Sequence, residues 1–302
     1  MTERLSASGF VAVVGFSNVG KSTLVNQLVG HKISIVSEKP QTTRNRIRGI
    51  LNGEDLQVVF VDTPGIQRPR DQLEENMVRG ARSAIGDVDV NLLVVDGSRK
   101  RPGRGDQACA GLVDQASCPS ILVINKMDAV PVGQREERIS AYRALGDFDR
   151  VVPASALHGH NMDVLMDEIV TRLPAGPRYF PAEMTTDQPM PFLVAELIRE
   201  KVLEVTEQEV PYSTAVSIIK VEEREGGHYY LAADILVERD SQKGILIGKG
   251  GRMIKTIGER SRKDVERALG VRVYLDLFVR VQKKWRDNHA ILKELGLRWE
   301  RG

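Results

Sequence analysis

Cysteine is nearly absent from this 302-residue sequence, which contains only Cys109 and Cys118. Two cysteines do not make a disulfide framework, and such low usage is typical of a reducing compartment. Long apolar runs are also missing, since FVAVV at 10–14 and LLVV at 92–95 are too short to cross a bilayer. The first ten residues lack the apolar core of a signal peptide. We therefore expect a cytoplasmic protein.

The chain as a whole has no large excess of one charge. Its net charge is +2, and its 41% hydrophobic and 28% charged residues are ordinary for a globular protein of about two domains. The average hides an uneven distribution. Residues 192–238 contain four Lys or Arg against ten Asp or Glu, whereas residues 239–288 contain fourteen against six. The basic segment is either a solvated surface or a face that binds an anionic partner.

Short apolar runs alternate with helix-length segments from residue 10 to residue 173. The runs predict strands at 10–15, 47–52, 56–62, 90–96, 120–125 and 150–155. The segments between them predict helices at 21–29, 74–84, 105–115, 134–145 and 162–173. Several strands are apolar on both faces, which suits a sheet covered by helices on both sides. The pattern predicts a doubly wound α/β domain with a mostly parallel sheet at 1–173.

A proline-rich stretch follows this domain, with five prolines within residues 173–191. Proline removes an amide donor and breaks regular elements, so we interpret 174–191 as a linker. The remaining residues, 192–302, follow another pattern. It predicts a helix at 192–206, strands at 213–223 and 228–239, a helix at 252–269, a strand at 271–281 and a short helix at 287–295. This order indicates a smaller α+β domain.

The segment GFSNVGKST, residues 15–23, joins the first predicted strand to the first predicted helix. It matches G-x-x-x-x-G-K-S, the P-loop pattern. Glycines let backbone amides turn toward an anion, and the helix N-terminus extends that anion site. Lys21 is expected to pair with the β- and γ-phosphates of a nucleotide. The predicted phosphate-binding residues are Gly15, Asn18, Val19, Gly20, Lys21, Ser22, Thr23, Asp62 and Gly65.

A second motif, NKMD at 125–128, selects the base. The Asp128 carboxylate can accept both N1–H and the exocyclic amine of guanine, whereas adenine presents an acceptor at its ring N1. Charge-assisted hydrogen bonds of roughly 1.5–3 kcal/mol each make this discrimination steep. Asn125 is expected to tie the base-binding loop to the P-loop, and Lys126 to cover the purine face. Ser155, Ala156 and Leu157 are expected to supply a backbone amide for the guanine oxygen. The predicted ligands are GTP and GDP.

A Mg²⁺ site is predicted from Ser22, Thr43 and Asp62. Ser22 offers a hydroxyl, and Asp62 of DTPG at 62–65 is expected to hold the water shell of the ion. A threonine of QTTR at 41–44 is expected to complete the coordination and to order its loop only with the γ-phosphate present. We favour Thr43 over Thr42 from the pattern of related proteins. The Gly65 amide is expected to reach the γ-phosphate.

The chain has no catalytic glutamine after Gly65, because Ile66 occupies that position. Ras-like GTPases place a water-orienting glutamine there. An isoleucine cannot orient water by hydrogen bonding, and the side chain of Gln67 is expected to point elsewhere. We therefore expect slow intrinsic hydrolysis, with rate supplied by another group or by a partner.

The second domain contains GKGG at 248–251, between an apolar stretch and a basic helix. G-x-x-G is the loop of KH domains, which clamps the backbone of about four nucleotides. Its glycines permit close approach of phosphates, and the helix N-terminus favours anions. Ile247 and Ile254 are expected to form an apolar floor under unstacked bases. The predicted RNA-binding residues are Ile247, Gly248, Lys249, Gly250, Gly251, Arg252 and Lys255, with Arg262 and Lys263 nearby.

With these motifs together, the chain resembles the Era family of GTPases over nearly its whole length. The resemblance implies a P-loop G domain joined to a type II KH domain. It also implies GTP hydrolysis tied to assembly of the 30S ribosomal subunit, with the KH domain binding 16S rRNA near its 3′ end. Family members further tend to contact the cytoplasmic face of the inner membrane peripherally. We expect a monomer.

Two positions depart from the usual family pattern. Ser17 precedes Asn18 where members usually have proline, and Gln67 occupies a position that often carries histidine. The second departure leaves the role of that histidine unassigned in this chain. Asn18 matches an asparagine found in potassium-responsive GTPases related to this family. Activation by K⁺ is therefore a hypothesis.

Three functions remain open from the sequence. The leading one is an RNA-coupled GTPase whose GTP state controls RNA capture during 30S assembly. The second is a constitutive RNA-binding module whose G domain senses nucleotide and hydrolyses it poorly. Nucleotide-dependent RNA affinity separates these two, because a ligand with equal affinity for both states shifts no equilibrium. An ATP-using kinase is the third, and Asp128 argues against it.

Overall fold

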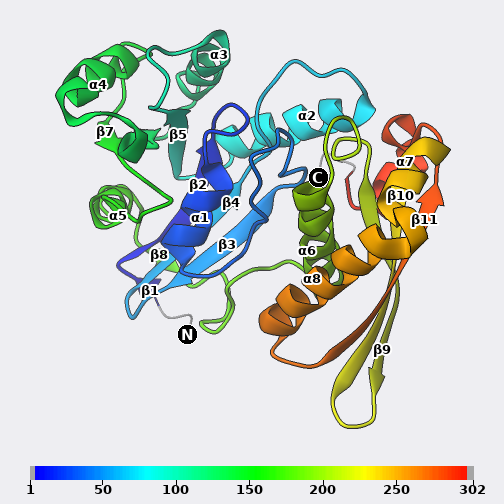
Figure 1. Ribbon diagram of the computed structural model, residues 1–302. Coiled ribbons are helices and arrows are strands. Elements are labelled where there is room, and N and C mark those ends of the chain that lie inside the picture. Colours follow the sequence, from blue (N-terminus) through cyan, green and yellow to red (C-terminus); the bar gives the residue numbers. More distant parts are fainter. Residues whose placement is uncertain (1–3, 298–302) are drawn as a thin grey trace. The chain divides into compact units, whose positions relative to one another are not determined.

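The computed structural model describes residues 4–297 (Figure 1). Two compact units make up this part of the chain. The first comprises residues 4–36, 43–69 and 74–187, and the second comprises residues 37–42, 70–73 and 188–297. Within residues 4–297, no helix is both long enough and apolar enough to span a membrane. The outer ends of the two predicted domains, 1–3 and 298–302, lie outside the described residues.

A six-stranded sheet forms the centre of the first unit, in the order β3-β4-β2-β5-β6-β7. β3 is antiparallel to β4, and the other neighbours are parallel. All of β5 is buried, as expected for a strand covered by helices on both faces. The predicted doubly wound, mostly parallel sheet is confirmed. The strands are β2 (Ala7–Val14), β3 (Ile47–Asn52), β4 (Leu56–Asp62), β5 (Val90–Asp96), β6 (Ser120–Asn125) and β7 (Arg150–Pro153).

Helices α2 (Gln72–Gly86), α3 (Arg104–Val113) and α4 (Arg135–Arg143) share one core cluster with the sheet. Ala81 of α2, Cys109 of α3 and Tyr142 of α4 are among its buried members. Helix α1 (Lys21–Val29) instead packs against β3 and α5 (Met162–Val170), and it contributes no residue to that cluster. Helices thus cover the faces of the sheet, and loops occupy the edges at which the strands end.

The parallel strands position the P-loop, DTPG and NKMD. The carboxyl ends of β2, β4, β5 and β6 meet at one edge of the sheet, where open α/β sheets bind ligands. The segments that follow them are the P-loop, DTPG, the loop after Asp96 and NKMD. Residues far apart in the chain therefore come together at this edge.

Residues 174–187 run along the edge of the sheet and belong to the first unit. The short strand β8 (Gly176–Pro177) pairs with β1 (Arg4–Leu5). The Ile50 amide donates to the Thr185 carbonyl (2.8 Å), and Gln57 Oε1 accepts from the Tyr179 amide (2.7 Å). These bonds satisfy polar groups along β3 and β4, although prolines prevent a regular strand. The bounds of the linker at 174–191 stay a prediction.

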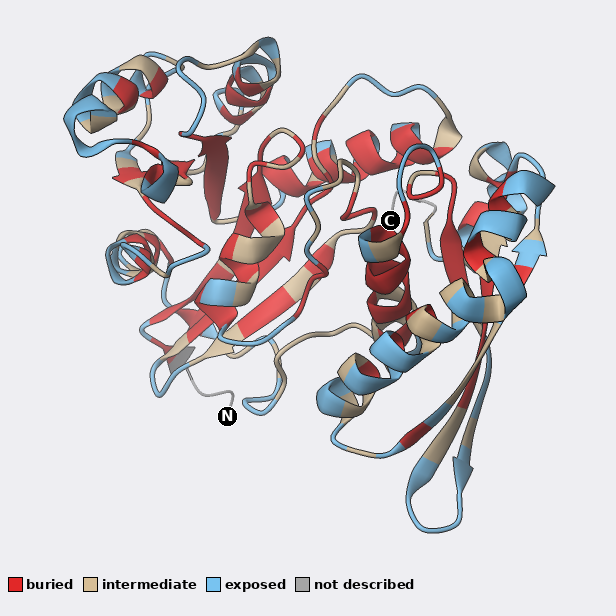
Figure 2. Ribbon diagram, viewed as in Figure 1, coloured by how far each residue is buried: buried red, intermediate tan, exposed pale blue. Residues whose placement is uncertain are grey.

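The second unit is built on a three-stranded sheet in the order β11-β10-β9. β10 (His228–Val237) pairs antiparallel with β9 (Ala215–Arg224) and parallel with β11 (Val273–Val281). Val194 of α6 (Met190–Val205) and Ile257 of α8 (Arg252–Leu269) pack into its core. Figure 2 shows α6 largely buried, whereas α8 exposes a continuous outer face. The predicted α+β second domain is confirmed.

Two helices of this unit differ from the prediction. Helix α7 (Asp240–Ile247) occupies a stretch for which we predicted only an apolar run. Gln242 stabilises its start by accepting the Glu238 amide (2.9 Å), whereas Gly244 weakens the helix signal in the sequence. Helix α9 (His289–Glu294) begins after the predicted residue 287, because the side chain of Asn288 caps it.

Candidate functional site

The P-loop lies between β2 and α1, as predicted. Gly20 has a φ of +97°, and a Cβ on it would collide with the side-chain nitrogen of Asn125. Glycine is therefore required there both by conformation and by space. The same close approach brings the base-recognition motif against the P-loop. The two motifs thus form one site at the edge of the sheet.

Lys21 points back into this loop. Its Nζ donates to the carbonyls of Phe16 (2.8 Å) and Gly15 (3.2 Å). Burial lowers the pKa of Lys21, and the charge of Asp62 acts in the opposite direction. A buried ammonium has lost water, so it interacts strongly with an anion that reaches it. This is the environment that a phosphate-binding lysine requires.

Three predicted Mg²⁺ ligands converge, although they come from α1, the loop before β3 and the end of β4. Ser22 Oγ donates to Asp62 Oδ2 (2.8 Å) and lies 2.8 Å from Thr43 Oγ1. Thr43 Oγ1 lies 3.5 Å from the same carboxylate oxygen. Thr42 makes a different bond, from its hydroxyl to the Lys39 carbonyl (2.6 Å). The geometry favours Thr43 over Thr42.

The donor set fits a hard cation. Ser22, Thr43 and Asp62 offer oxygen atoms only, which Mg²⁺ prefers. Asp62 Oδ1 is buried and has no hydrogen-bond partner among the described residues. Burial raises the pKa of Asp62, and Lys21 and the neighbouring hydroxyls oppose the rise. Within residues 4–297, no group of three His, Cys, Asp or Glu side chains gathers to hold a metal. The candidate cation site therefore depends on hydroxyl groups.

The DTPG segment lies directly on the P-loop. Gly65 packs against the backbone of Ser17, and the Ile66 amide donates to the Gly15 carbonyl (3.2 Å). The side chain of Ile66 is buried in the core cluster that contains α2 and α3. It therefore points away from the phosphate loop. Gln67 is half-buried.

Asn125 joins three segments of the predicted nucleotide site. Its Nδ2 donates to the Val19 carbonyl (2.9 Å), and its Oδ1 accepts from the Ala156 amide (2.9 Å). The P-loop, NKMD and the Ser155–Leu157 segment are thus fixed to one side chain. Ser155 is buried, whereas Leu157 is 72% exposed. Exposure of Leu157 leaves this side of the base site open.

Lys126 and Asp128 each lie beside a residue that was not predicted to belong to the site, Asp96 for Lys126 and His158 for Asp128. Lys126 Nζ donates to the Asn18 carbonyl (2.7 Å) and to Asp96 Oδ2 (2.8 Å). An Asp128 carboxylate oxygen lies 3.7 Å from His158 Nε2. Asp96 had a signal in the sequence, since it is an acidic residue at the end of a buried strand, as Asp62 is. Nothing in the sequence pointed to His158.

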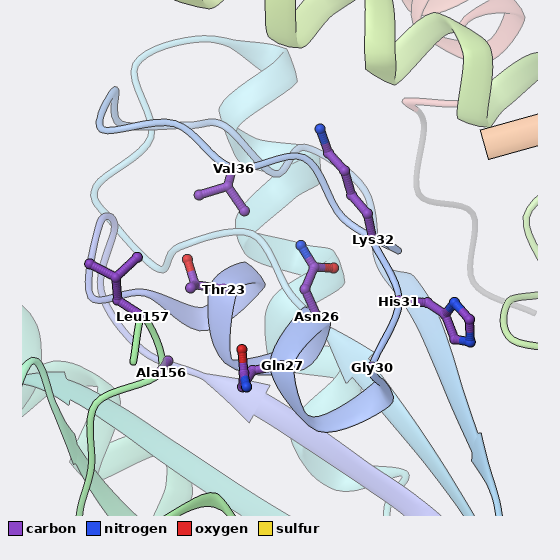
Figure 3. A pocket seen from close by; sticks show the side chains of 9 residues that line it. All are labelled: Thr23, Asn26, Gln27, Gly30, His31, Lys32, Val36, Ala156 and Leu157. Carbon is purple, nitrogen blue, oxygen red and sulfur yellow. The ribbon is translucent and has the colours of Figure 1, made fainter. Parts of the chain in front are cut away.

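A pocket of about 450 Å³ opens between α1 and the loop after β7 (Figure 3). Thr23 lines it from α1, and Ala156 and Leu157 line it from the facing loop. Thr23 belongs to the predicted phosphate set, and the other two belong to the predicted guanine set. Both sets therefore border one cavity. Lys32 also lines this pocket.

The GKGG loop of the second unit connects α7 to α8. Gly248, Gly250 and Gly251 all have positive φ values, of 71°, 62° and 76°. This backbone course favours glycine and turns the loop sharply into the N-terminus of α8. Lys249, Arg252 and Lys255 are exposed beside it. An anionic strand can therefore reach backbone amides and cations together.

Two isoleucines flank this loop in the chain, Ile247 before it and Ile254 after it. Ile247 and Ile254 are partly buried and pack against the core of the second unit. Arg262 and Lys263 are exposed further along α8. Glu259 lies 3.9 Å from Lys255, and Glu204 lies 3.8 Å from Arg260, so acids temper the basic face. The glycine loop itself is therefore the part of this face that favours an anion most.

Comparison with known proteins agrees with this geometry. The family model described as 50S ribosome-binding GTPase matches residues 10–126, and the KH domain model matches residues 209–286. GTPase Era from Geotalea uraniireducens is 49% identical over 296 residues, which cover 98% of this chain and 99% of the relative. This chain belongs to the Era family of GTPases.

Solved Era structures share the whole fold. A variant of Aquifex aeolicus Era bound to GDP and AlF₄⁻ is 37% identical, with a TM-score of 0.93, and the match covers 97% of this chain and 100% of that one. Era in complex with MgGDPNP and nucleotides 1506–1542 of 16S ribosomal RNA has the same identity and TM-score, and the match covers 97% and 99%. The Era fold thus extends over both units of this chain.

Proposed function

We propose that this Era-family GTPase binds 16S rRNA near its 3′ end and acts in assembly of the 30S subunit, with its GTP state coupled to RNA binding. The observation that carries the proposal is that Asn125 ties the P-loop to NKMD in the first unit, while the second unit exposes a basic GKGG loop. The solved complex of an Era relative with MgGDPNP and a 16S rRNA fragment supports it.

In the proposed reaction, the first unit binds GTP, and water attacks its γ-phosphate while the bond from the γ-phosphorus to the β–γ bridging oxygen breaks, which gives GDP and phosphate. The P-loop amides and Lys21 hold the phosphates and stabilise the negative charge that develops on them. Ser22, Thr43 and Asp62 would hold Mg²⁺, whose positive charge would stabilise the negative charge that develops on the phosphates. Gly65 contributes its amide near the γ-phosphate. Ile66 faces the core, so this chain offers no water-orienting side chain at that position.

Base selection is assigned to the loop after β6. Asp128 accepts the two guanine donors, and the stem of Lys126 covers the purine face. Asn125 holds this loop against the P-loop and against Ala156. The base and phosphate contacts are therefore made by one connected structure, which favours binding of an intact guanine nucleotide.

RNA binding is assigned to Ile247, the GKGG loop, Arg252 and Lys255. The loop amides and cations hold the phosphate backbone, and exposed apolar atoms near the loop contact unstacked bases. Phosphate contacts make this affinity fall steeply with salt. A single-stranded segment is favoured, because its backbone can follow the sharp turn of the loop.

The decisive experiment titrates an oligonucleotide from the 3′ end of small-subunit rRNA at constant salt. The protein is held with a GTP analogue, with GDP or without nucleotide. Tighter binding with the GTP analogue is expected if GTP controls RNA capture. Equal affinity in all three states would favour the alternative function, a constitutive RNA-binding module with a nucleotide-sensing G domain. The buried position of Ile66 is the feature that favours this alternative.

Potassium activation is a finer part of the proposal. Asn18 has a φ of 63°, which holds this P-loop residue in a left-handed conformation, and it is the residue assigned to K⁺. GTP turnover is expected to be faster in KCl than in NaCl at equal ionic strength. Identical turnover in the two salts would remove K⁺ from the mechanism.

Cytoplasmic location, peripheral membrane contact and a monomeric state complete the proposal. Each has a direct measurement. Light scattering with size-exclusion chromatography is expected to give the mass of one chain, 33.5 kDa. Co-sedimentation with anionic vesicles is expected to capture the protein reversibly and to fail at high salt. Release of the chain from membranes by salt in a cell lysate tests the location.

A further inference from the structure

Asp96 contacts the lysine of NKMD at the edge of the sheet. It is the last residue of β5, and its side chain is 8% exposed. Its Oδ2 accepts from Lys126 Nζ at 2.8 Å. The same Nζ donates to the Asn18 carbonyl at 2.7 Å. One ammonium group therefore joins the base-recognition loop, the P-loop and the end of β5.

The carboxylate of Asp96 is fixed independently of Lys126. Its Oδ1 accepts from Ser98 Oγ (2.6 Å) and from the Ser98 amide (3.1 Å). Its backbone carbonyl accepts from the buried Tyr142 hydroxyl (2.6 Å). Burial acts to raise the pKa of Asp96, but hydrogen bonds from Lys126 and Ser98 outweigh it and lower that pKa. Asp96 is thus a rigid anion at neutral pH.

Lys126 and Asn18 both need such an anchor. Their φ values are 62° and 63°, in a left-handed region that is unfavourable for residues with a side chain. A lysine side chain also has several rotatable bonds, so its stem covers a purine only if its end is held. Arg99 is another cation near Asp96, and its Nε lies 3.9 Å from Asp96 Oδ2. Lys126 is therefore the closer partner.

We propose that Asp96 is a positioning residue for guanine-nucleotide binding, and that it acts by holding Lys126 over the base and against the P-loop. This inference rests on the proposed assignment of Lys126 to the base site. Asp96 touches neither the phosphates nor the base in this scheme. Its loss is expected to weaken binding while leaving the chemical step unchanged.

The experiment measures dissociation of a fluorescent GDP analogue from the full chain by stopped flow. Asp96→Asn is expected to raise the dissociation rate about tenfold. The KM for GTP should rise similarly, and kcat should change less than twofold. Lys126→Met, which keeps an alkyl stem, is expected to raise the rate at least as much. Asp96→Asn added to Lys126→Met should have little further effect, because both changes break the same contact, between Asp96 and Lys126.

Asp89→Asn is the matched control. Asp89 directly precedes β5, and its Oδ2 accepts from the Phe10 amide (2.7 Å), at the opposite end of the strand. This variant should lose stability without changing nucleotide dissociation, measured well below both melting temperatures. Ser98→Ala, which removes one hydroxyl bond to Asp96, should raise the dissociation rate by a smaller factor of about three. It tests the inference even if Asp96→Asn does not fold.

Four outcomes would overturn the inference. Equal effects of Asp96→Asn and Asp89→Asn would assign both to general destabilisation. Additive effects of Asp96→Asn and Lys126→Met would mean that Asp96 does not act through Lys126. A strong effect of Lys126→Met with none from Asp96→Asn or Ser98→Ala would refute the role of Asp96 and leave the proposed function intact. Unchanged dissociation from Lys126→Met would instead refute the base-site assignment, and the inference with it.

Discussion

The side-chain nitrogen of Asn125 donates a 2.9 Å hydrogen bond to the carbonyl of Val19, although 106 residues separate them in the chain. Asn125→Ala breaks this bond and the bond from the Ala156 amide. Each buried bond contributes about 1 kcal/mol to stability. We expect a lower melting temperature and at least tenfold weaker GTP binding, measured by calorimetry. Asn91→Ala is the control, because Asn91 is buried and donates to the Ile85 carbonyl (3.2 Å) away from the P-loop. It should lose stability without losing affinity.

Asp128→Asn is expected to exchange guanine selectivity for xanthine selectivity. Xanthine presents a carbonyl oxygen where guanine has its exocyclic amine, and an asparagine amide can donate to it. The affinity for GTP should fall by at least about a hundredfold, since charge-assisted hydrogen bonds are lost. The affinity for XTP should rise. Competition of both nucleotides against labelled GDP measures the exchange, and parallel losses for GTP and XTP would contradict the assignment.

Asp62→Asn is expected to stabilise the protein without Mg²⁺ and nucleotide while weakening Mg²⁺-dependent GTP binding at least tenfold. Burial raises the pKa of Asp62, so the folded state holds this proton more tightly than the unfolded state does. The resulting contribution to the free energy of unfolding is fully present below about pH 4 and is lost as the pH rises through the folded pKa. Above the folded pKa, the ionised carboxylate therefore lowers stability relative to the protonated form. Thermal melts of the native protein and the variant from pH 4 to pH 8 measure how stability depends on pH. A lower melting temperature for the variant than for the native protein at pH 7 would contradict the prediction.

Gly250→Asp is expected to weaken RNA binding at least tenfold without changing GTP turnover in the absence of RNA. A Cβ at Gly250 meets no atom within 4 Å, so the change adds charge without a steric clash. Gly227→Asp is a close control, because Gly227 also has positive φ (72°) and open space, in the turn between β9 and β10. The control should bear the same backbone strain and keep RNA affinity. Equal losses in both variants would place RNA binding elsewhere on the second unit.

Gln67→Ala is expected to leave single-turnover GTP hydrolysis within about threefold of the native rate, because we assign no water-orienting role to Gln67. Ile66→Ala should act mainly on stability. Ile66 is buried in the core, and large-to-small core substitutions cost about 2–5 kcal/mol. The rate of single-turnover GTP hydrolysis by Ile66→Ala should stay near the native rate at temperatures where the variant is folded. Loss of most activity in either variant would require a direct catalytic role at 66 or 67.

Much of the candidate site was predictable because its chemistry is local. A P-loop needs glycines, a lysine and a hydroxyl at fixed spacing within one turn, so Gly20, Lys21 and Ser22 signal it directly. NKMD and GKGG are equally short. The strands that carry the P-loop and NKMD are buried on both faces, and their apolar runs are visible without tertiary information. The alternation of these apolar runs with helix-length segments predicted the fold class.

Other features depended on contacts between distant segments. Helix α7 was missed because Gly244 weakens its local signal, whereas packing of Leu246 into the core stabilises it. The pattern of related proteins favoured Thr43 over Thr42, but a physical reason for that choice needed the position of the loop relative to Ser22 and Asp62. No local pattern distinguishes two adjacent threonines in a polar stretch.

The sequence by itself determined the two-domain order, the guanine-nucleotide motifs and the basic glycine loop. Each is encoded by residues within a few positions of one another, where backbone conformation and hydrogen-bonding groups are set locally. Only the tertiary structure placed Asp96 against Lys126, Asn125 against Val19 and Thr185 against Ile50. Such pairs are decided by sheet order and register, because strand packing brings together residues that no spacing rule connects.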